Sequence, residues 1–379
     1  MPIPVYDRDK INRPFLDDMK IAVERVITSN LDVDHEVSRF EAEFAAWNGA
    51  SFAVSVNSGT AALLASLLAL GIKPGDEVIT VPNTDGATSS AVVMSGANLV
   101  WVDIDPVTRT MSPEALKAAL TPRTRAIVPV DMFGHPADID QIKAIATERE
   151  IPVVEDSCLA LGATINGRKV GSLATTTCFS FGRNKHLGAM GAGGCVLTES
   201  GDLAERLRKI SEYGESRGRS WKKSGLGKDG WFWHETIGMS QRLDEIQAAL
   251  LRVKLPSIEA NIACRRRQAA RYEAALNGSA IRVPQCRPGV EHAWRNYVIE
   301  VANRDHLRER LAEKGIGTNL TYMPPMHLQP AFAALERPRG SYPTTESICD
   351  RLVGLPIGPH LEDEQQDYVI EQLLVSVDH

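Results

Sequence analysis

The stretch Phe179–Thr198, FSFGRNKHLGAMGAGGCVLT, places Lys185 between two runs with strand character. A dinucleotide-binding glycine loop must lie between a strand and a helix. The segment GAMGAGG has TTCFSF before it and GCVLT after it, so it does not fit that class of site. A lysine in a glycine-lined turn can lose part of its hydration, and a desolvated amine can form a Schiff base with a carbonyl. A lysine packed along the surface is the alternative interpretation.

Composition excludes several classes of protein. The 379 residues include 42 Lys and Arg against 48 Asp and Glu, a net charge of −6, and we find no basic stripe that would favour nucleic acid. The start, MPIPVYDRDKINRP, lacks the apolar run of a secretory signal, and the longest apolar stretch, AALLASLLAL, is too short to span a membrane. The six cysteines show no metal-ligand spacing, so we expect free thiols, no bound metal and a cytoplasmic location.

Strand-like and helix-like runs alternate through the first half of the chain. The strand-like runs are FAVSV at 52–56, EVITVP at 77–82, LVWVDID at 99–105, RAIVPV at 125–130 and PVVED at 152–156. This alternation predicts an α/β fold with a mostly parallel sheet flanked by helices.

The second half has a different pattern. We expect a long helix over 240–277 with a kink near Pro256, a strand over 296–301 and a last helix over about 363–376. The sequence therefore predicts a large domain over residues 1–252 and a smaller α+β domain over residues 253–379.

Two further features fall where strands are expected to end. NSGTAALL at 57–64 would present free N–H groups at a helix start, which is an anion site, although a plain capped turn has the same sequence. Asp156 ends the run VVED, where it is either a capping residue or the partner of a cation. Pyridoxal phosphate needs a lysine for its aldehyde, an aspartate for its ring nitrogen and an anion site for its phosphate. The three features together favour this cofactor more strongly than any one of them.

Several longer motifs resemble those of the DegT/DnrJ/EryC1/StrS family, the fold-type I aminotransferases of sugar and cyclitol biosynthesis. They include SGTAALLASLLALGIKPGDEVITVP, VVEDSCLALGATINGRKVGS, FSFGRNKHLGAMGAGGCVLT and GIGTNLTYMPPMHLQPAF, and the resemblance covers residues 10–375. It implies a seven-stranded type of sheet and a pyridoxal phosphate enzyme that moves an amino group from glutamate or glutamine. The implied acceptor is a keto sugar, nucleotide-linked in our expectation, or a keto cyclitol. The resemblance also implies a homodimer with a shared active site.

The resemblance assigns roles to individual residues. Lys185 matches the lysine that binds the cofactor and Asp156 its ring-nitrogen partner. Ser240 matches a position that reaches the phosphate of the partner subunit, and we expect it at the head of the long helix as an N-cap. The remaining assignments are cofactor contacts at Gly59, Thr60, Ala61, Asp85 and Ser180, and substrate contacts at His292, Asn296, Tyr322 and His327.

Some positions depart from the family pattern. Leu159 stands where a Gln or His is usual, Asp85 or a near neighbour where a stacking aromatic is usual, and Ser240 where an Asn is usual. A branch of the family with a histidine in place of the lysine performs dehydration, but Lys185 is in register here, so transamination is favoured. The alternatives are a pyridoxal phosphate enzyme of another type, dehydratase-like or lyase, and a non-catalytic regulatory protein that binds the cofactor.

Overall fold

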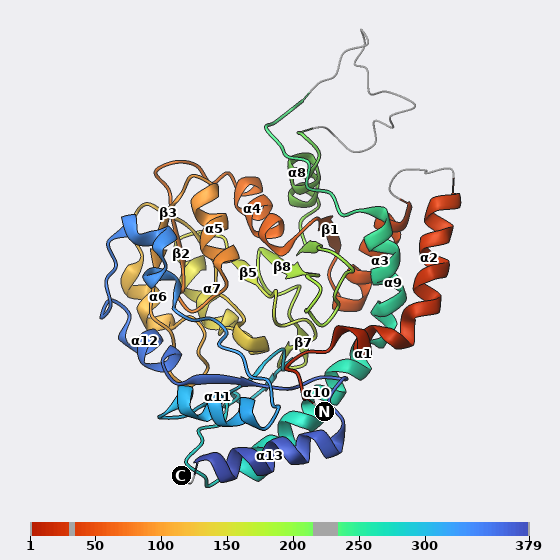
Figure 1. Ribbon diagram of the computed structural model, residues 1–379. Coiled ribbons are helices and arrows are strands. Elements are labelled where there is room, and N and C mark those ends of the chain that lie inside the picture. The colour runs from red at the N-terminus through yellow and green to blue at the C-terminus, as the bar shows by residue number, and fades with distance from the viewer. Residues whose placement is uncertain (1, 30–34, 215–233, 378–379) are drawn as a thin grey trace.

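A seven-stranded sheet forms the centre of the molecule (Figure 1). The computed structural model describes residues 2–29, 35–214 and 234–377. The strand order is β3-β2-β4-β5-β8-β9-β1, with two isolated parallel bridges, Ile127–Val153 and Val130–Asp156, joining β4 to β5. The strands are β1 (Phe52–Val56), β2 (Glu77–Thr80), β3 (Asn98–Trp101), β4 (Thr124–Ile127), β5 (Val154–Asp156), β8 (Thr176–Ser180) and β9 (Gly194–Thr198).

Only β9 runs against its neighbours in this sheet. It pairs antiparallel with both β1 and β8, whereas the other pairs are parallel. The carboxyl ends of the other six strands therefore meet at one edge, and the loop 181–193, which carries Lys185, connects β8 to β9 at that edge. The predicted mostly parallel sheet is confirmed.

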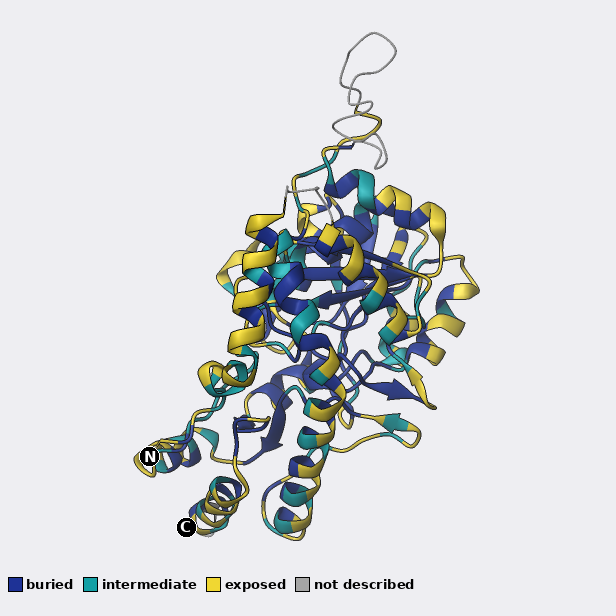
Figure 2. Ribbon diagram, turned by 90° about the vertical axis from the view of Figure 1, so that its right-hand side faces the viewer, coloured by how far each residue is buried: buried dark blue, intermediate teal, exposed yellow. Residues whose placement is uncertain are grey.

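Alternating side chains along each strand bury both faces of the sheet. Val54, Val56 and Cys178 point into a core shared with α4 (Gly59–Ala69) and α8 (Gly201–Ser211). Ala53 and Phe179 point to the opposite face, where they pack with α3 (His35–Asn48) and α9 (Glu245–Lys254). Helix α4 is apolar on nearly all sides, as a fully buried helix must be, and Figure 2 shows buried strands between helices with exposed outer faces.

Further helices complete the layers around the sheet. Helix α2 (Leu16–Thr28) packs on α9, and α5 (Gly86–Met94) packs on α4. The others in this part of the chain are α1 (Arg8–Asn12), α6 (Pro113–Ala119), α7 (Ile139–Thr147) and α12 (Pro343–Cys349). Ser112 caps α6 by accepting a hydrogen bond from the Ala115 N–H.

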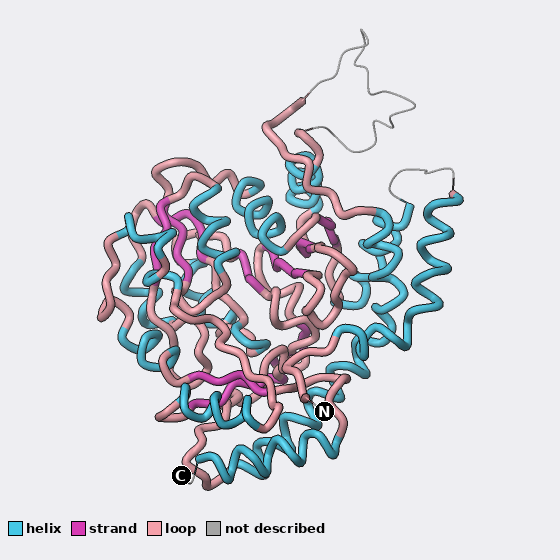
Figure 3. The backbone as a smooth tube through the Cα atoms, viewed as in Figure 1, coloured by secondary structure: helices cyan, strands magenta, loops and turns pink. Residues whose placement is uncertain are grey.

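A second core lies at the lower end of the molecule in Figure 3, beneath a two-stranded antiparallel sheet. That sheet consists of β11 (Tyr297–Glu300) and β12 (Leu352–Leu355), and the helices against it are α10 (Ile258–Leu276), α11 (Arg304–Glu313) and α13 (Asp363–Val377). Ile3, from the start of the chain, joins this core and bridges to Ile316. A small sheet of β10 (Val290–Glu291), β6 (Thr164–Ile165) and β7 (Arg168–Lys169) lies apart from it.

The predicted long helix begins later than expected. Helix α9 begins at Glu245, and Asp244, not Ser240, caps it by accepting a hydrogen bond from the Ile246 N–H. The prediction of a helix start at Ser240 is wrong because the backbone there is bonded elsewhere: Met239 N–H donates to Ile210 O, and Gln241 O accepts from Asn57 N–H. The predicted kink is confirmed as the 3₁₀ turn Leu255–Ser257, which contains Pro256.

Residue 252, the predicted domain boundary, lies inside α9, and the two-domain division stays a prediction. Within the described residues, no helix combines the length and the apolar character needed to cross a bilayer.

Candidate active site

The N-terminus of α4 forms a cradle at the carboxyl end of β1. Ser58 caps the helix by accepting a hydrogen bond from the Ala61 N–H at 3.1 Å. The Gly59 and Thr60 N–H groups have no acceptor within the helix and find none among the described residues. A Cβ on Gly59 would lie 2.7 Å from Ser180 Cβ and 3.0 Å from Cys158 Sγ, so this space is open only because residue 59 is glycine. Free N–H groups at a helix start suit a phosphate.

Asp156 is the last residue of β5, and its carboxylate is buried. The Thr88 hydroxyl donates to Asp156 Oδ2 at 2.7 Å, and the Cys158 N–H donates to Oδ1 at 3.2 Å. The Thr88 hydroxyl already donates its hydrogen to the carboxylate. The Thr84 hydroxyl, whose oxygen lies 2.6 Å from that of Thr88, must therefore donate to Thr88. Both partners of Asp156 are neutral, which leaves its charge available to a cation.

Lys185 lies in the loop between β8 and β9, half-buried, and its backbone N–H donates to Gly182 O at 2.7 Å. Burial lowers the pKa of the Lys185 amine, and the positive charge of Arg295 acts in the same direction. Within the described residues, Lys185 Nζ makes no hydrogen bond or ion pair. A desolvated amine without a partner is a nucleophile when neutral.

These three features fit pyridoxal phosphate. The cradle around Gly59 supplies N–H donors and the Ser180 hydroxyl for a phosphate, Asp156 a buried carboxylate for a ring nitrogen, and Lys185 an amine for an aldehyde. The side chains reach one edge of the sheet from the ends of β1, β5 and β8. The sequence motifs that carried the prediction are thus brought together.

Tyr322 and Asp85 belong to the same neighbourhood. Burial raises the pKa of the Tyr322 phenol, and the negative charges of Asp85 and Asp156 raise it further, so the phenol is a neutral donor. Asp85 caps α5 by accepting from the Ala87 N–H at 3.1 Å. Asp85 therefore presents a carboxylate at the start of α5.

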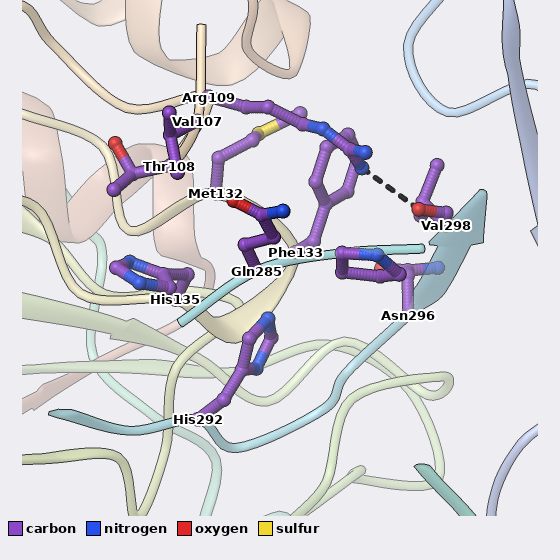
Figure 4. Close-up of a pocket in the computed structure, with 11 residues that line it drawn as sticks. Val107, Thr108, Arg109, Met132, Phe133, His135, Gln285, His292, Asn296 and Val298 are labelled. Carbon is purple, nitrogen blue, oxygen red and sulfur yellow. Dashed lines mark hydrogen bonds between the residues drawn. The ribbon is translucent and has the colours of Figure 1, made fainter. Parts of the chain in front are cut away.

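His292 and Asn296 line a different cavity, shown in Figure 4 together with His135 and Arg109. The cavity measures about 10 Å³, which is about the space of one water molecule. The His292 ring stacks on Trp294 with centroids 3.9 Å apart and accepts the Trp294 N–H through Nδ1 at 2.7 Å. Neither Lys185 nor Asp156 lines this cavity, and a substrate role for His292 and Asn296 stays a prediction.

His327 is also buried. Its Nε2 lies 3.0 Å from Glu346 Oε1, and its ring meets Tyr342 edge-on at 4.8 Å. The neighbouring Met326 approaches the start of α5, because a Cβ on Gly86 would lie 4.0 Å from its Sδ. A contact between His327 and substrate likewise stays a prediction.

Ser240 lies on the surface in a short bridge to Glu212. The following residue, Gln241, receives the Asn57 N–H at 2.7 Å, so this segment runs beside the strand end that leads into the α4 cradle. An exposed hydroxyl at this position is accessible to a second subunit.

Sequence reasoning missed Thr88, Cys158 and Arg295. Thr88 and Cys158 touch Asp156 directly, and Arg295 acts on Lys185 through its charge. Thr88 lies in α5 and Arg295 lies 110 residues beyond Lys185 in the chain, and no local pattern marks either of them. Cys158 follows Asp156 by two residues, so its proximity to Asp156 could have been predicted from the sequence.

Comparison with known proteins identifies the family. The profile of the DegT/DnrJ/EryC1/StrS aminotransferase family matches residues 17–374. The chain belongs to this family. The erythromycin biosynthesis sensory transduction protein EryC1 of Saccharopolyspora erythraea is 40% identical over 98% of this chain and 99% of its own. The dTDP-3-amino-3,4,6-trideoxy-alpha-D-glucose transaminase of Streptomyces venezuelae is 40% identical over 92% of this chain and 89% of its own.

Two solved structures superpose closely on the chain. S. venezuelae DesV in complex with a ketimine intermediate has a TM-score of 0.94 at 37% identity, covering 100% of this chain and 99% of DesV. NtdA of Bacillus subtilis, with bound cofactor PMP, has a TM-score of 0.90 at 27% identity, covering 100% of this chain and 86% of NtdA. The fold is that of an aminotransferase, and the expectation drawn from the motifs is confirmed.

Proposed function

We propose that this aminotransferase uses pyridoxal phosphate to move an amino group from glutamate or glutamine to a nucleotide-linked keto sugar. The observation that carries the proposal is the convergence of the Lys185 amine, the Asp156 carboxylate and the α4 cradle at one edge of the sheet. A relative with 40% identity is named as a transaminase of a dTDP-linked amino sugar, which supports this class of acceptor. A keto cyclitol is the second class of acceptor.

Each residue has a defined task in this proposal. When bound, pyridoxal phosphate supplies an aldehyde for covalent attachment and a ring that accepts electrons from the substrate carbon. Lys185 would hold the aldehyde, and Gly59, Thr60 and Ser180 would hold the phosphate. Asp156 would keep the proton on the ring nitrogen, since a buried carboxylate with only neutral partners favours a cation beside it.

Lys185 also moves the proton. Its lowered pKa makes the neutral amine more abundant near neutral pH, and a neutral amine can take the proton from the carbon that carries the donor's amino group. The raised pKa of the Cys158 thiol keeps that neighbour protonated, so it does not compete as a base.

The test is a half-reaction followed by absorbance. The purified holoenzyme should absorb as a lysine-bound cofactor, lose that band with L-glutamate or L-glutamine, and regain it with a dTDP-linked or UDP-linked 3-keto sugar. Recovery with scyllo-inosose alone would place the acceptor among keto cyclitols. A protein that keeps its band with every amino donor would contradict transamination and favour another cofactor-dependent reaction or a regulatory role. The name sensory transduction protein, carried by one relative, makes the regulatory outcome worth measuring.

We also propose a homodimer in the cytoplasm with a shared active site. An apolar groove of about 520 Å³ runs along α2, lined by Leu16, Met19, Lys20, Val23, Glu24, Ile27, Met190 and Leu250. Met190 belongs to the same loop as Lys185, so a second copy seated in the groove would contact that loop. Six cysteines without a disulfide support a reducing compartment.

A further inference from the structure

Within the described residues, the Arg295 guanidinium makes no hydrogen bond and no ion pair. Its Nε is buried without a hydrogen bond, and the side chain forms no ion pair with any described carboxylate. Among the described arginines, the two that are buried are satisfied: Arg109 pairs with Glu300 at 3.0 Å, and Arg265 donates to the carbonyls of Trp294 and Ile357. Arg287 and Arg351 also have an Nε without a hydrogen bond, but they form ion pairs with Asp138 and Glu300. Because an unpartnered buried polar group costs free energy, an orphaned guanidinium points to a ligand that supplies the acceptor.

The backbone around Arg295 is clamped in place. Ala293 N–H donates to Gly134 O at 2.9 Å, and Asn296 N–H donates to Phe133 O at 3.1 Å. A Cβ on Gly134 would lie 2.9 Å from Arg295 N, so the two segments can approach this closely only because residue 134 is glycine. The base of the Arg295 side chain is therefore fixed.

Two contacts hold this segment against the loop that carries Lys185. His186, the residue after Lys185, bonds through Nε2 to Ala293 O at 2.9 Å. The Tyr6 hydroxyl donates to Arg183 O at 3.4 Å, and the Arg295 Cζ lies 5.5 Å from the centre of the Tyr6 ring. Arg295 thus lies beside the reactive lysine, and its charge lowers the pKa of the Lys185 amine and that of the Tyr322 phenol.

The chemistry of the donor supplies the missing acceptor. An amino-acid donor must bring its amino group to the aldehyde that Lys185 would hold. Its α-carboxylate is attached to the same carbon as that amino group. A guanidinium binds a carboxylate through two parallel hydrogen bonds, a geometry that a lysine cannot reproduce. The α4 cradle, with its own N–H donors, serves a different anion, the phosphate.

We propose that Arg295 binds the α-carboxylate of the amino donor, with the Tyr322 phenol as a second hydrogen-bond donor. This inference rests on the proposed function and adds the residue that recognises the donor. The diphosphate of a nucleotide-linked acceptor is the other anion that a guanidinium at this edge could bind, and the test separates the two.

The test compares Arg295→Gln with the wild-type holoenzyme, using Arg295→Lys as the conservative variant and Arg267→Gln as the control. Arg267 is exposed on α10, so its loss changes the net charge equally without touching the site. Stopped-flow absorbance gives the apparent dissociation constant for L-glutamate and for L-glutamic acid α-amide, which lacks the α-carboxylate. Calorimetry gives the affinities of glutarate and of thymidine diphosphate without turnover.

Arg295→Gln should raise the dissociation constants of L-glutamate and glutarate by about 10- to 100-fold. It should abolish the wild-type preference for L-glutamate over the α-amide, and Arg295→Lys should recover part of the affinity. Unchanged dissociation constants for L-glutamate and glutarate would overturn the proposal, as would a loss confined to thymidine diphosphate. If the wild type failed to react with any donor yet bound glutarate through Arg295, the proposed function would fail while the carboxylate site stood.

Discussion

Three carboxyl groups, from Asp131, Glu155 and Asp156, lie together where β4 and β5 end. Asp131 N–H donates to Asp156 O, and the Ser157 hydroxyl donates to the Asp131 carboxylate. Burial raises the pKa of Asp131 well above its usual range, and the charges of Glu155 and Asp156 add to the rise. The neutral form of Asp131 is therefore favoured, and a neutral Asp131 adds no negative charge beside Asp156, the group that faces the site.

Lys185 is the residue on which the proposed chemistry depends. Borohydride reduction of the holoenzyme and peptide mapping should find the pyridoxyl group on Lys185, since its amine is desolvated and without a partner. Lys185→Ala should lose the band of the lysine-bound cofactor and at least about 1,000-fold in turnover. Lys169→Ala is the matched control, because Lys169 is tied to Glu259 at 2.6 Å and lies over the Trp47 ring. A pyridoxyl group on Lys169 would contradict the assignment.

Glu155 makes stability depend on pH. Burial raises its pKa from 4.5 to about 7, so the folded state holds a proton that the unfolded state releases. Stability should therefore fall as pH rises from 4.5 to about 7 and then level off, by at most about 3 kcal/mol. Glu155→Gln should remove this fall, measured by urea unfolding of both proteins at pH 5 and pH 8.

Glu77 provides a control of opposite sign. The Thr121 hydroxyl and Arg123 lower the pKa of Glu77, so its charge stabilises the fold above its ordinary pKa and that contribution is lost in acid. Glu77→Gln should therefore cost more stability at pH 7 than below pH 4, where the Glu77 charge is lost. If the stability of Glu155→Gln depended on pH in the same way as that of the wild type, Glu155 would not be the group that takes up the proton on folding.

At the scale of elements, the start of helix α4 is the part of the site that we propose binds the phosphate. Gly59→Ala places a Cβ 2.7 Å from Ser180 Cβ, so the cradle must open or lose its phosphate contacts. We expect the dissociation constant of pyridoxal phosphate to rise by at least about tenfold, with a smaller change in thermal stability. Gly201→Ala is the matched control, since Gly201 begins α8 and its Cβ would meet only the Phe52 ring, at 3.4 Å or more. Equal cofactor affinities for the two variants would exclude the cradle as the phosphate site.

The sequence predicts elements best where pattern and local chemistry agree. β1 and α4 follow from FAVSV and the apolar run after Ser58, because a buried strand and a buried helix both need continuous apolar residues. The start of the long helix was misplaced because residues 238–242 bond to β1 and α8, a tertiary contact with no local signal. The same limit explains why Arg295 was not predicted, because its proposed role depends on His186 and Tyr6 from distant parts of the chain.

At the scale of the whole molecule, exposed apolar side chains are concentrated on α2. Leu16 is 50% exposed, Ile21 60% and Ile27 66%, and Met190 beside them is 47% exposed. Leu16, Ile27 and Met190 line the groove along α2, and an apolar groove of this size suits a second protein surface. The groove adjoins the Lys185 loop through Met190, and Ser240 lies on the surface near the α4 cradle. Assembly and cofactor binding are therefore expected to be coupled.

The double variant Leu16→Glu with Ile27→Glu tests that coupling, because two charges in an apolar interface oppose association. We expect sedimentation to show a monomer and the affinity for pyridoxal phosphate to fall well beyond tenfold. Ser240→Ala would remove the proposed neutral hydrogen bond to the phosphate of the cofactor in the partner subunit, and it should raise the dissociation constant of pyridoxal phosphate by about tenfold at most. Val375→Glu is the matched control, since Val375 is 48% exposed on α13, away from the groove. A monomer that held the cofactor as tightly as the wild type would mean that Gly59, Thr60 and Ser180 of one chain bind the phosphate alone.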